Sequence, residues 1–241
     1  MTEFSEGWED HQCILIILAH PDDPEFFLGA TIARWTHSGH RVIYCLLTRG
    51  DKGANDPKID PAELSLRREN EQRAAAAVLG VEDVRFLNFS DGCLTAGMEE
   101  RQAVTRMIRE VKPDILVTCD PLNYFPTDNN INHPDHRAAG QIVIDAVFPG
   151  AGSPMFFPEM FDEGLQPHSV KEVWLSLTAQ PNTLIDVTEH WATKIRALHE
   201  HVSQIPDYPK LDERMRSRHT PDSTPDHPRY EEKFKRITFI R

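Results

Sequence analysis

Residues 14–25, ILIILAHPDDPE, form an apolar run that ends in one histidine and three acidic residues. A continuous run of apolar and β-branched residues is typical of a strand that is covered on both faces, as in the parallel sheets of α/β proteins. In open α/β sheets, ligands bind beyond the carboxyl ends of the strands. We therefore expect His20, Asp22, Asp23 and Glu25 to lie where a functional site would form.

The rest of the chain alternates between strand-like and helix-like segments. We expect strands at 14–19, 41–48, 84–89, 114–119, 170–177 and 184–187, and helices at 27–35, 63–79, 98–111, 134–147 and 188–203, the last capped by Thr188. This alternation predicts a single-domain α/β fold with a Rossmann-like, mostly parallel sheet flanked by helices. If the first four strands take the order 3-2-1-4, the loops after Ala19 and Cys119 flank one crevice, which places the active site at the carboxyl ends of strands 1 and 4.

The domain is expected to span residues 1–241, with a polar N-terminal extension at 1–12. Prolines and mixed charges predict a loosely structured segment at 206–230, after which EEKFKRITFIR docks back as a strand or helix. Residues 148–168 are expected to be irregular. The apolar side chains of this segment indicate a subunit interface, so we expect a homo-oligomer; they are Met155, Phe156, Phe157 and Met160.

Charge and hydropathy limit the classes of partner. The formal net charge is −12, and the absence of a basic run argues against nucleic acid or an anionic membrane as the main partner. No apolar segment approaches the roughly 20 residues that span a bilayer, and the polar N-terminus does not resemble a secretory signal. A cytoplasmic protein with a small-molecule substrate fits best. The four cysteines are far apart and three lie in or beside predicted strands, which favours buried free thiols.

A second cluster, Asn132-His133-Pro134-Asp135-His136-Arg137, follows the long loop 120–133. With the first cluster it offers imidazole nitrogens and carboxylate oxygens, which suit zinc or another divalent transition metal. Catalytic zinc typically has three protein ligands, and His20, Asp23 and His136 would form such a set. Asp22 would then act as a base towards water activated at the metal. Either cluster alone also fits a structural role, since Asp135 would favour the positive end of a helix dipole.

The two clusters belong to a longer series of motifs. In order, these are Ala19-His20-Pro21-Asp22-Asp23-x-Glu25, Gly29-x-Thr31, Thr48-x-Gly50-Asp51, Arg68-x-x-Glu71, Leu79-Gly80, Asp91-Gly92, His133-Pro134-Asp135-His136 and Lys194-x-x-Ala197-Leu198-x-x-His201-x-Ser203-Gln204. The series resembles the PIG-L/LmbE-like zinc-dependent N-deacetylase family. The first strand lacks the G-x-G-x-x-G that would follow it in a dinucleotide-binding fold.

The resemblance implies zinc-dependent removal of an N-acetyl group from an N-acetylglucosamine-type amino sugar or small glycoconjugate. By this resemblance, the metal ligands are His20, Asp23 and His136, and the general base is Asp22. Arg68 and Asp91 would contact substrate hydroxyls. A cationic His133 would stabilise the oxyanion or protonate the leaving amine, and Asp135 would orient His133 and tune its charge. Some relatives have a tyrosine just before HPDH, whereas residues 125–132 here are FPTDNNIN. The oxyanion would then depend on zinc and His133.

Simpler roles remain open for the supporting residues. Arg68 and Glu71 fit a surface ion pair, and Asp91-Gly92 fits a turn. We interpret Glu25 as an acid near the start of a helix and His201 as a structural residue. Two other functions also fit the scaffold: a zinc-dependent hydratase of an unsaturated dicarboxylic acid, or a metal-binding module without turnover.

Overall fold

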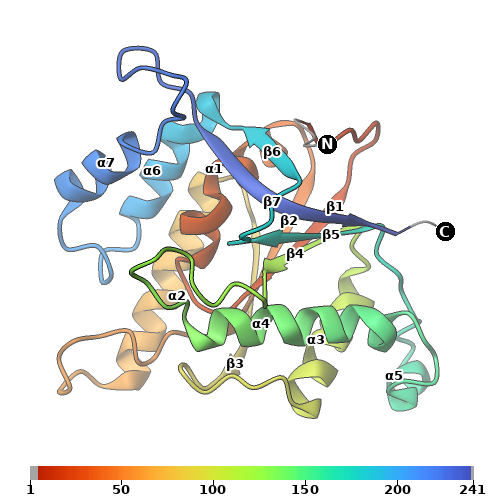
Figure 1. Cartoon of the computed structure of the whole chain (residues 1–241). Helices are drawn as coiled ribbons and strands as arrows, with labels where there is room; N and C mark the ends of the chain where they lie inside the picture. Colours follow the sequence, from red (N-terminus) through yellow and green to blue (C-terminus); the bar gives the residue numbers. More distant parts are fainter. Residues whose placement is uncertain (1–4, 240–241) are drawn as a thin grey trace.

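The computed structural model describes residues 5–239, which form one seven-stranded sheet flanked by helices (Figure 1). The strands are β1 Cys13–Leu18, β2 Arg41–Thr48, β3 Asp83–Phe89, β4 Ile115–Cys119, β5 Glu172–Ser176, β6 Thr183–Asp186 and β7 Glu231–Thr238. The α-helices are α1 Asp23–His37, α2 Pro61–Val78, α3 Met98–Val111, α4 Pro134–Asp145, α5 Pro158–Asp162, α6 Trp191–His199 and α7 Tyr208–Arg216. The predicted α/β fold class is confirmed.

The strand order is β3-β2-β1-β4-β5-β7-β6. Strands β1 to β5 are parallel to one another, and β7 is antiparallel to both β5 and β6. The expected order 3-2-1-4 is therefore confirmed. Strands β2 and β3 lie on one side of β1, and β4 and β5 lie on the other, so the strand order reverses between β1 and β4. The loops that follow these two strands lie at the same edge of the sheet.

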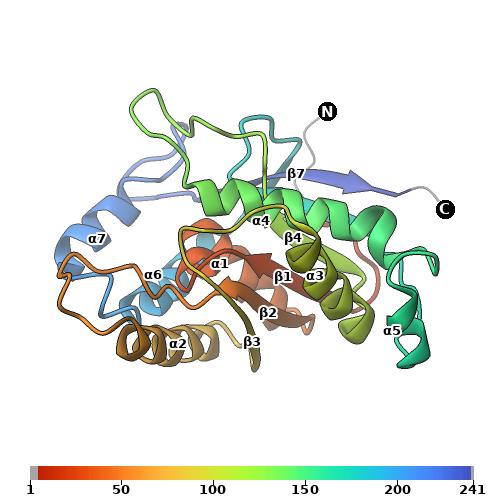
Figure 2. The same ribbon diagram turned by 90° about the horizontal axis from the view of Figure 1, so that it is seen from below.

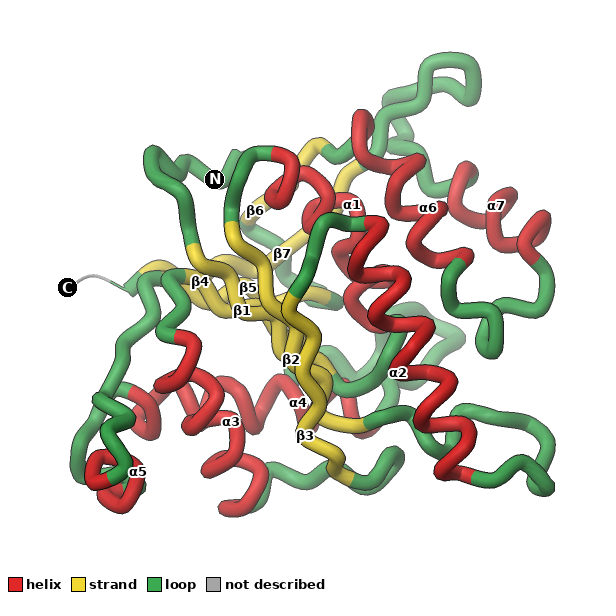
Figure 3. Tube along the Cα trace, turned by 180° about the vertical axis from the view of Figure 1, so that it is seen from behind, coloured by secondary structure: helices red, strands yellow, loops and turns green. Residues whose placement is uncertain are grey.

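Alternate residues of β1 pack into two separate cores. Ile14, Ile16 and Leu18 face the core beneath α1, α2 and α6, while Leu15 and Ile17 face the core beneath α3 and α4. Figures 2 and 3 show these two helical layers on opposite faces of the sheet. Burial on both faces explains why β1 has a continuous apolar sequence rather than an alternating one.

Helix α1 is interrupted at Leu28, whose φ of −148° and ψ of 23° are not helical. Two buried side chains satisfy backbone groups beside the interruption. The Lys194 ammonium donates to the Phe26 carbonyl at 2.9 Å, and the Glu232 carboxylate accepts from the N–H groups of residues 30 and 31. Lys194 Nζ and Glu232 Oε1 lie 2.6 Å apart. The first turn of α1, which carries the acidic motif, is thus a separate piece of helix held by Lys194 of α6, while Glu232 of β7 holds the piece that follows.

The segment 206–230 is more ordered than its composition predicts. It contains α7, whose N-terminus is capped by the Asp207 carboxylate accepting from Lys210 N–H at 3.0 Å. Leu211 and Met215, four residues apart, are buried in the core beneath α1. This apolar pair at helical spacing docks the short helix together with two hydrogen bonds, from Trp191 Nε1 to the Met215 carbonyl at 3.2 Å and from the Tyr208 hydroxyl to the His199 carbonyl at 3.1 Å. The following EEKFKRITFIR segment forms β7, and its last two residues lie outside the described chain.

Residues 148–168, expected to be irregular, are organised around Arg109 of α3. Its buried guanidinium donates to the carbonyls of Gly150, Ser153 and Phe156 at 2.8–2.9 Å. The segment also includes part of a π-helical turn, Ala146–Ala151, and helix α5. The expected apolar patch is reduced, because Met155 and Phe156 are exposed whereas Met160 is fully buried.

Two further local expectations differ from the structure. Thr188 does not cap α6; it lies in a 3-10 turn, Thr188–His190, and its hydroxyl accepts from Tyr230 N–H at 3.0 Å. In the N-terminal extension, residues 1–4 lie outside the described chain, but Trp8 packs against Trp35 and Trp174. All four cysteines are free, as expected, but only Cys45 and Cys119 are buried; Cys13 is partly buried and Cys93 is exposed. Among residues 5–239, no helix combines the length and apolar character needed to cross a membrane.

Candidate active site

The turn after β1 places the first cluster at the edge of the sheet. The Asp23 carboxylate accepts from the His20 N–H at 2.9 Å, which closes the turn before α1 begins. Asp22, at the helix N-cap, has a φ of +85°, a left-handed conformation that is costly for a residue with a Cβ. Such strain persists only where surrounding contacts hold it, and it often marks a functional site.

The start of α4 brings the second cluster to the same place. His133 is the N-cap residue, and its Nδ1 accepts from the Asp135 backbone N–H at 3.2 Å. Asp135 is fully buried, and its carboxylate accepts from Gly92 N–H at 2.7 Å and Leu94 N–H at 3.2 Å. Contrary to expectation, none of these hydrogen bonds joins the Asp135 carboxylate to the His133 ring. The carboxylate instead lies 3.2 Å from His20 Nε2. Asp135 thus orients His133 through its backbone.

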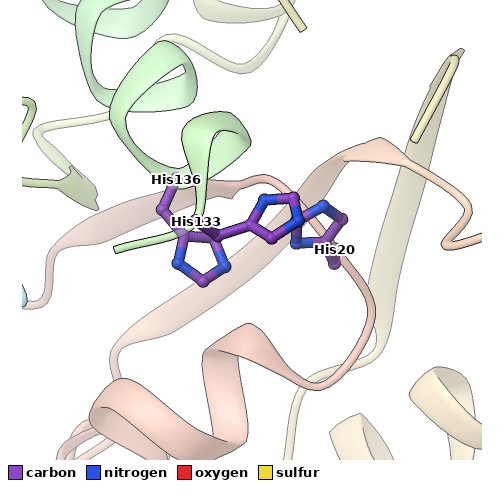
Figure 4. Close-up of side chains that lie close together, drawn as sticks. All are labelled: His20, His133 and His136. Carbon is purple, nitrogen blue, oxygen red and sulfur yellow. The ribbon is translucent and has the colours of Figure 1, made fainter. Parts of the chain in front are cut away.

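Three imidazoles meet between the two clusters. Figure 4 shows His20 from the β1 turn beside His133 and His136 from the start of α4. One ring nitrogen from each lies within 4.8 Å of the other two, a spacing that suits a shared metal ion. The ring centroids of His20 and His133 are 4.7 Å apart. His133 is exposed while His20 is buried, so the group opens to solvent on one side.

The predicted ligands His20, Asp23 and His136 are also brought together. Asp23 Oδ1 lies 3.1 Å from His136 Nε2, and Asp23 Oδ2 lies 3.5 Å from His20 Nδ1. His136 Nδ1 is 3.0 Å from the side-chain oxygen of the buried Asn132, which directs Nε2 towards Asp23. Such outer contacts fix the orientation and tautomer of metal-binding histidines.

Asp91 and Arg68, predicted to contact substrate, both face the clusters. Asp91 Oδ1 lies 3.2 Å from His20 Nε2, and Oδ2 accepts from Lys52 N–H. Together His20, Asp91 and Asp135 form a second group with metal-binding spacing. Arg68 is 4% exposed, so the surface ion pair considered from its spacing to Glu71 is wrong.

The charges around His20 favour a cation. Burial opposes its protonation, but hydrogen bonds to the carboxylates of Asp135, Asp23 and Asp91 outweigh this and raise the pKa of His20 to about 12. Burial alone would raise the pKa of Asp23, yet His136 and His20 hold it below its usual range. Nitrogen and oxygen donors that gather around one positive charge fit a divalent transition metal, which would replace the proton.

Asp22 and His133 have environments that differ from those of the ligand candidates. Burial raises the pKa of Asp22 to about 6, against the opposing charge of Arg68, whose Nη2 lies 3.2 Å from Asp22 Oδ2. Burial lowers the pKa of His133, and the neighbouring imidazoles His20 and His136 lower it further. The lowered pKa favours a neutral His133, in contrast to the cationic one expected from the sequence. Since its Nδ1 accepts a hydrogen bond, Nε2 carries the ring proton.

Sequence reasoning missed the residues that orient the clusters. Asn132 directs His136, and Gln72 accepts from the Asp22 N–H at 2.8 Å. Asn132 could have been found from its place directly before HPDH. Gln72 has no such signal, apart from lying one helical turn after Arg68.

The segment that carries both clusters is similar to a known protein family. Residues 15–147 match the family model described as PIG-L, GlcNAc-PI de-N-acetylase. The chain belongs to the PIG-L family. The family match therefore spans both clusters, including each residue that contributes a nitrogen to the three-imidazole group.

Named relatives extend the similarity over most of the chain. It is 38% identical to a diacetylchitobiose deacetylase of Thermococcus kodakarensis over 205 residues, which cover 85% of this chain and 74% of the relative. It is 30% identical to a 1D-myo-inositol 2-acetamido-2-deoxy-alpha-D-glucopyranoside deacetylase of Actinosynnema mirum, with 80% of each chain covered. The solved N,N'-diacetylchitobiose deacetylase of Pyrococcus horikoshii superposes with a TM-score of 0.87 at 30% identity, covering 98% of this chain and 87% of that chain.

Proposed function

We propose that this PIG-L family member is a zinc-dependent N-deacetylase that hydrolyses the acetamide of an N-acetylglucosamine-type sugar or small glycoconjugate. The observation that carries the proposal is the convergence of His20, Asp23, His133 and His136 beside the strained Asp22. The relatives support the substrate class, since those named above are deacetylases of N-acetylated amino sugars. Enzyme activity of the N-deacetylase class follows from the same similarity.

We assign the metal to His20, Asp23 and His136, because Asp23 touches both imidazoles and Asn132 directs His136 towards it. A zinc ion bound there would act as a Lewis acid on the acyl oxygen and lower the pKa of water. His133 is left free of the ligand set. Its exposed position gives it access to substrate.

The protein groups divide the remaining chemistry. The Asp22 carboxylate takes a proton as the oxygen of water attacks the acyl carbon, and a proton must reach the amine nitrogen as the carbon–nitrogen bond breaks. A pKa of about 6 suits both directions of transfer near neutral pH. His133 Nε2–H donates to the acyl oxygen as negative charge develops there. The products are acetate and the free amino sugar.

Asp91 completes the proposal as a substrate-binding residue, whereas the direct contact with substrate expected for Arg68 becomes an indirect one. Asp91, with one oxygen facing His20, lies beside the reacting groups. Arg68 is enclosed, and its guanidinium contacts the Asp22 carboxylate, so its influence on substrate would pass through Asp22. A cytoplasmic location and a homo-oligomeric state remain predictions.

Turnover tests the proposal directly. Purified zinc-loaded protein should release acetate and free amine from N,N'-diacetylchitobiose or a related N-acetylglucosaminide. Asp22→Asn should keep its metal and lose about 10²–10⁴-fold in kcat, the usual contribution of a positioned base. Asp56→Asn, in an exposed loop, is the matched control and should be fully active. Activity only towards unsaturated dicarboxylic acids, or none in the metal-loaded protein, would overturn the proposal.

Metal content tests the ligand assignment separately. Asp23→Ala and His136→Ala should each lose bound zinc after dialysis, as measured by mass spectrometry of the metal. His133→Ala should retain zinc while losing activity. Loss of zinc from His133→Ala together with retention in Asp23→Ala would instead assign the metal to the three imidazoles.

A further inference from the structure

The peptide bond between Pro21 and Asp22 is held from both sides by α2. Arg68 Nη2 donates to the Pro21 carbonyl at 2.7 Å, and Gln72 Oε1 accepts from the Asp22 N–H at 2.8 Å. These two groups belong to the same peptide plane, and Arg68 and Gln72 lie one helical turn apart on α2. Rotation of this plane would break at least one of the two bonds. We propose that Gln72 is a positioning residue that holds Asp22 in its left-handed, catalytically useful conformation.

The amide of Gln72 has one orientation because of Glu25. An ionised carboxylate only accepts hydrogen bonds, and Gln72 Nε2 lies 3.0 Å from both oxygens of Glu25. The donor end of the amide must therefore face Glu25, which leaves its oxygen for the Asp22 N–H. Both side chains are fully buried, so water does not offer an alternative partner.

His201 holds the far side of Glu25. Its Nε2 lies 3.0 Å from Glu25 Oε2, and both side chains are fully buried. The hydrogen bonds thus form a directional series in which His201 donates to Glu25, Gln72 donates to Glu25, and Asp22 N–H donates to Gln72. Glu25 therefore does more than favour a helix start, and His201, from the segment after α6, takes part in setting the geometry of the β1 turn.

The need for such a series follows from the strain at Asp22. A non-glycine residue in the left-handed region carries a cost of order 1–3 kcal/mol unless its surroundings impose it. Without Gln72, the turn has an easier path to a relaxed conformation, and the Asp22 carboxylate moves with it. Displacement of a reacting group by about 1 Å can lower the rate by about 10²-fold.

The effect on turnover rests on the proposed function, but the effect on Asp22 does not. We expect Gln72→Met, close in volume but unable to make either bond, to lower kcat by about 10- to 100-fold with KM changed less than about twofold. Zinc content should be unchanged. In the metal-free protein, the Asp22 N–H should exchange with solvent at least about tenfold faster when measured by nuclear magnetic resonance.

Exchanging the amide and the carboxylate between positions 72 and 25 distinguishes a positioning role of Gln72 from a packing role. Gln72→Glu should be impaired because two carboxylates face each other. Adding Glu25→Gln restores the series, since the new amide donates to position 72 and accepts from His201, while position 72 still accepts from Asp22. The double variant should recover kcat to within about threefold of wild type. Recovery would not follow if position 72 served only to fill space.

Glu172→Gln is the control for loss of a buried carboxylate network. Glu172 accepts from Trp8 and Trp174 at the amino end of β5, the edge of the sheet opposite the site. The Glu172→Gln variant should have a lower melting temperature than wild type and an unchanged kcat. Wild-type kcat in Gln72→Met, unchanged exchange at Asp22, or a double variant as impaired as Gln72→Glu would each overturn the positioning role. Absence of deacetylation by wild type would refute the proposed function, while the exchange measurement would still test the role of Gln72.

Discussion

The ion pair beside the interruption of α1 should contribute strongly to stability. Lys194 and Glu232 are 1% and 5% exposed, and their charged atoms lie 2.6 Å apart. Burial lowers the pKa of Lys194, and the carboxylate of Glu232 opposes this effect. Removing one partner leaves the other charge buried without compensation, at a cost of about 3–5 kcal/mol.

Glu232→Gln keeps the size and one acceptor of the side chain but removes its charge. We expect the free energy of unfolding to fall by about 3–5 kcal/mol, equivalent to a fall in melting temperature of about 6–20 °C for a chain of this size. Urea denaturation at neutral pH, followed by circular dichroism, measures the change directly. Lys194→Met should produce a loss of similar size.

The double variant and a surface pair test the reasoning. Combining Lys194→Met with Glu232→Gln should cost less than the two single losses added together, since no unpaired charge remains. Lys171→Met removes an exposed ion pair with Asp114, whose charged atoms are 3.0 Å apart, and should cost no more than about 1 kcal/mol. If Glu232→Gln were as mild as Lys171→Met, or the double variant fully additive, the assigned energy of the buried pair would be wrong.

Two further changes test other parts of the fold. Hydrogen bonds from Arg85 hold the pKa of Asp83 below its usual range. Asp83 therefore stabilises the folded state at pH above its unfolded pKa of about 3.9, and this contribution is lost as the pH falls through its lower folded pKa. The difference in free energy of unfolding between wild type and Asp83→Asn, measured by urea titration, should shrink below about pH 4, and a constant difference would contradict this. Gly140→Ala should destabilise by about 1–3 kcal/mol or more, because a Cβ there would lie 2.3 Å from the Cys119 carbonyl, and an unchanged melting temperature would show that α4 does not approach β4 so closely.

The sheet was predictable because its signals are local. The apolar runs of β1, β2 and β4 identify buried strands, and the order of strands and helices limits the possible topologies. The meeting of His20 with His133 and His136 followed from one rule, that the loops after β1 and β4 share an edge of the sheet. These predictions needed no knowledge of individual side-chain contacts.

The roles that could not be predicted depend on contacts between distant segments. Glu25 and His201 are 176 residues apart in sequence, and neither carries a local sign of its partner. Arg109 orders the segment 148–168 by binding carbonyl oxygens, which every residue possesses. The Asp135 carboxylate faces His20 because the loop at Gly92 offers it N–H donors, a feature of backbone conformation rather than of residue type.

The interruption of α1 also bears on the timing of folding during synthesis. Glu232 bonds the N–H groups of residues 30 and 31, about 200 positions earlier in the chain. At about 5–20 residues per second, the ribosome adds Glu232 roughly 10–40 s after this part of α1. The first five strands can pair before then, but residues 30 and 31 of α1 lack their partner on β7, and Lys194, which binds the Phe26 carbonyl in the turn that carries Asp23, lacks its counter-ion. The catalytic end of the first strand is therefore made early and completed late, so a nascent chain can pair its five parallel strands well before it acquires its activity.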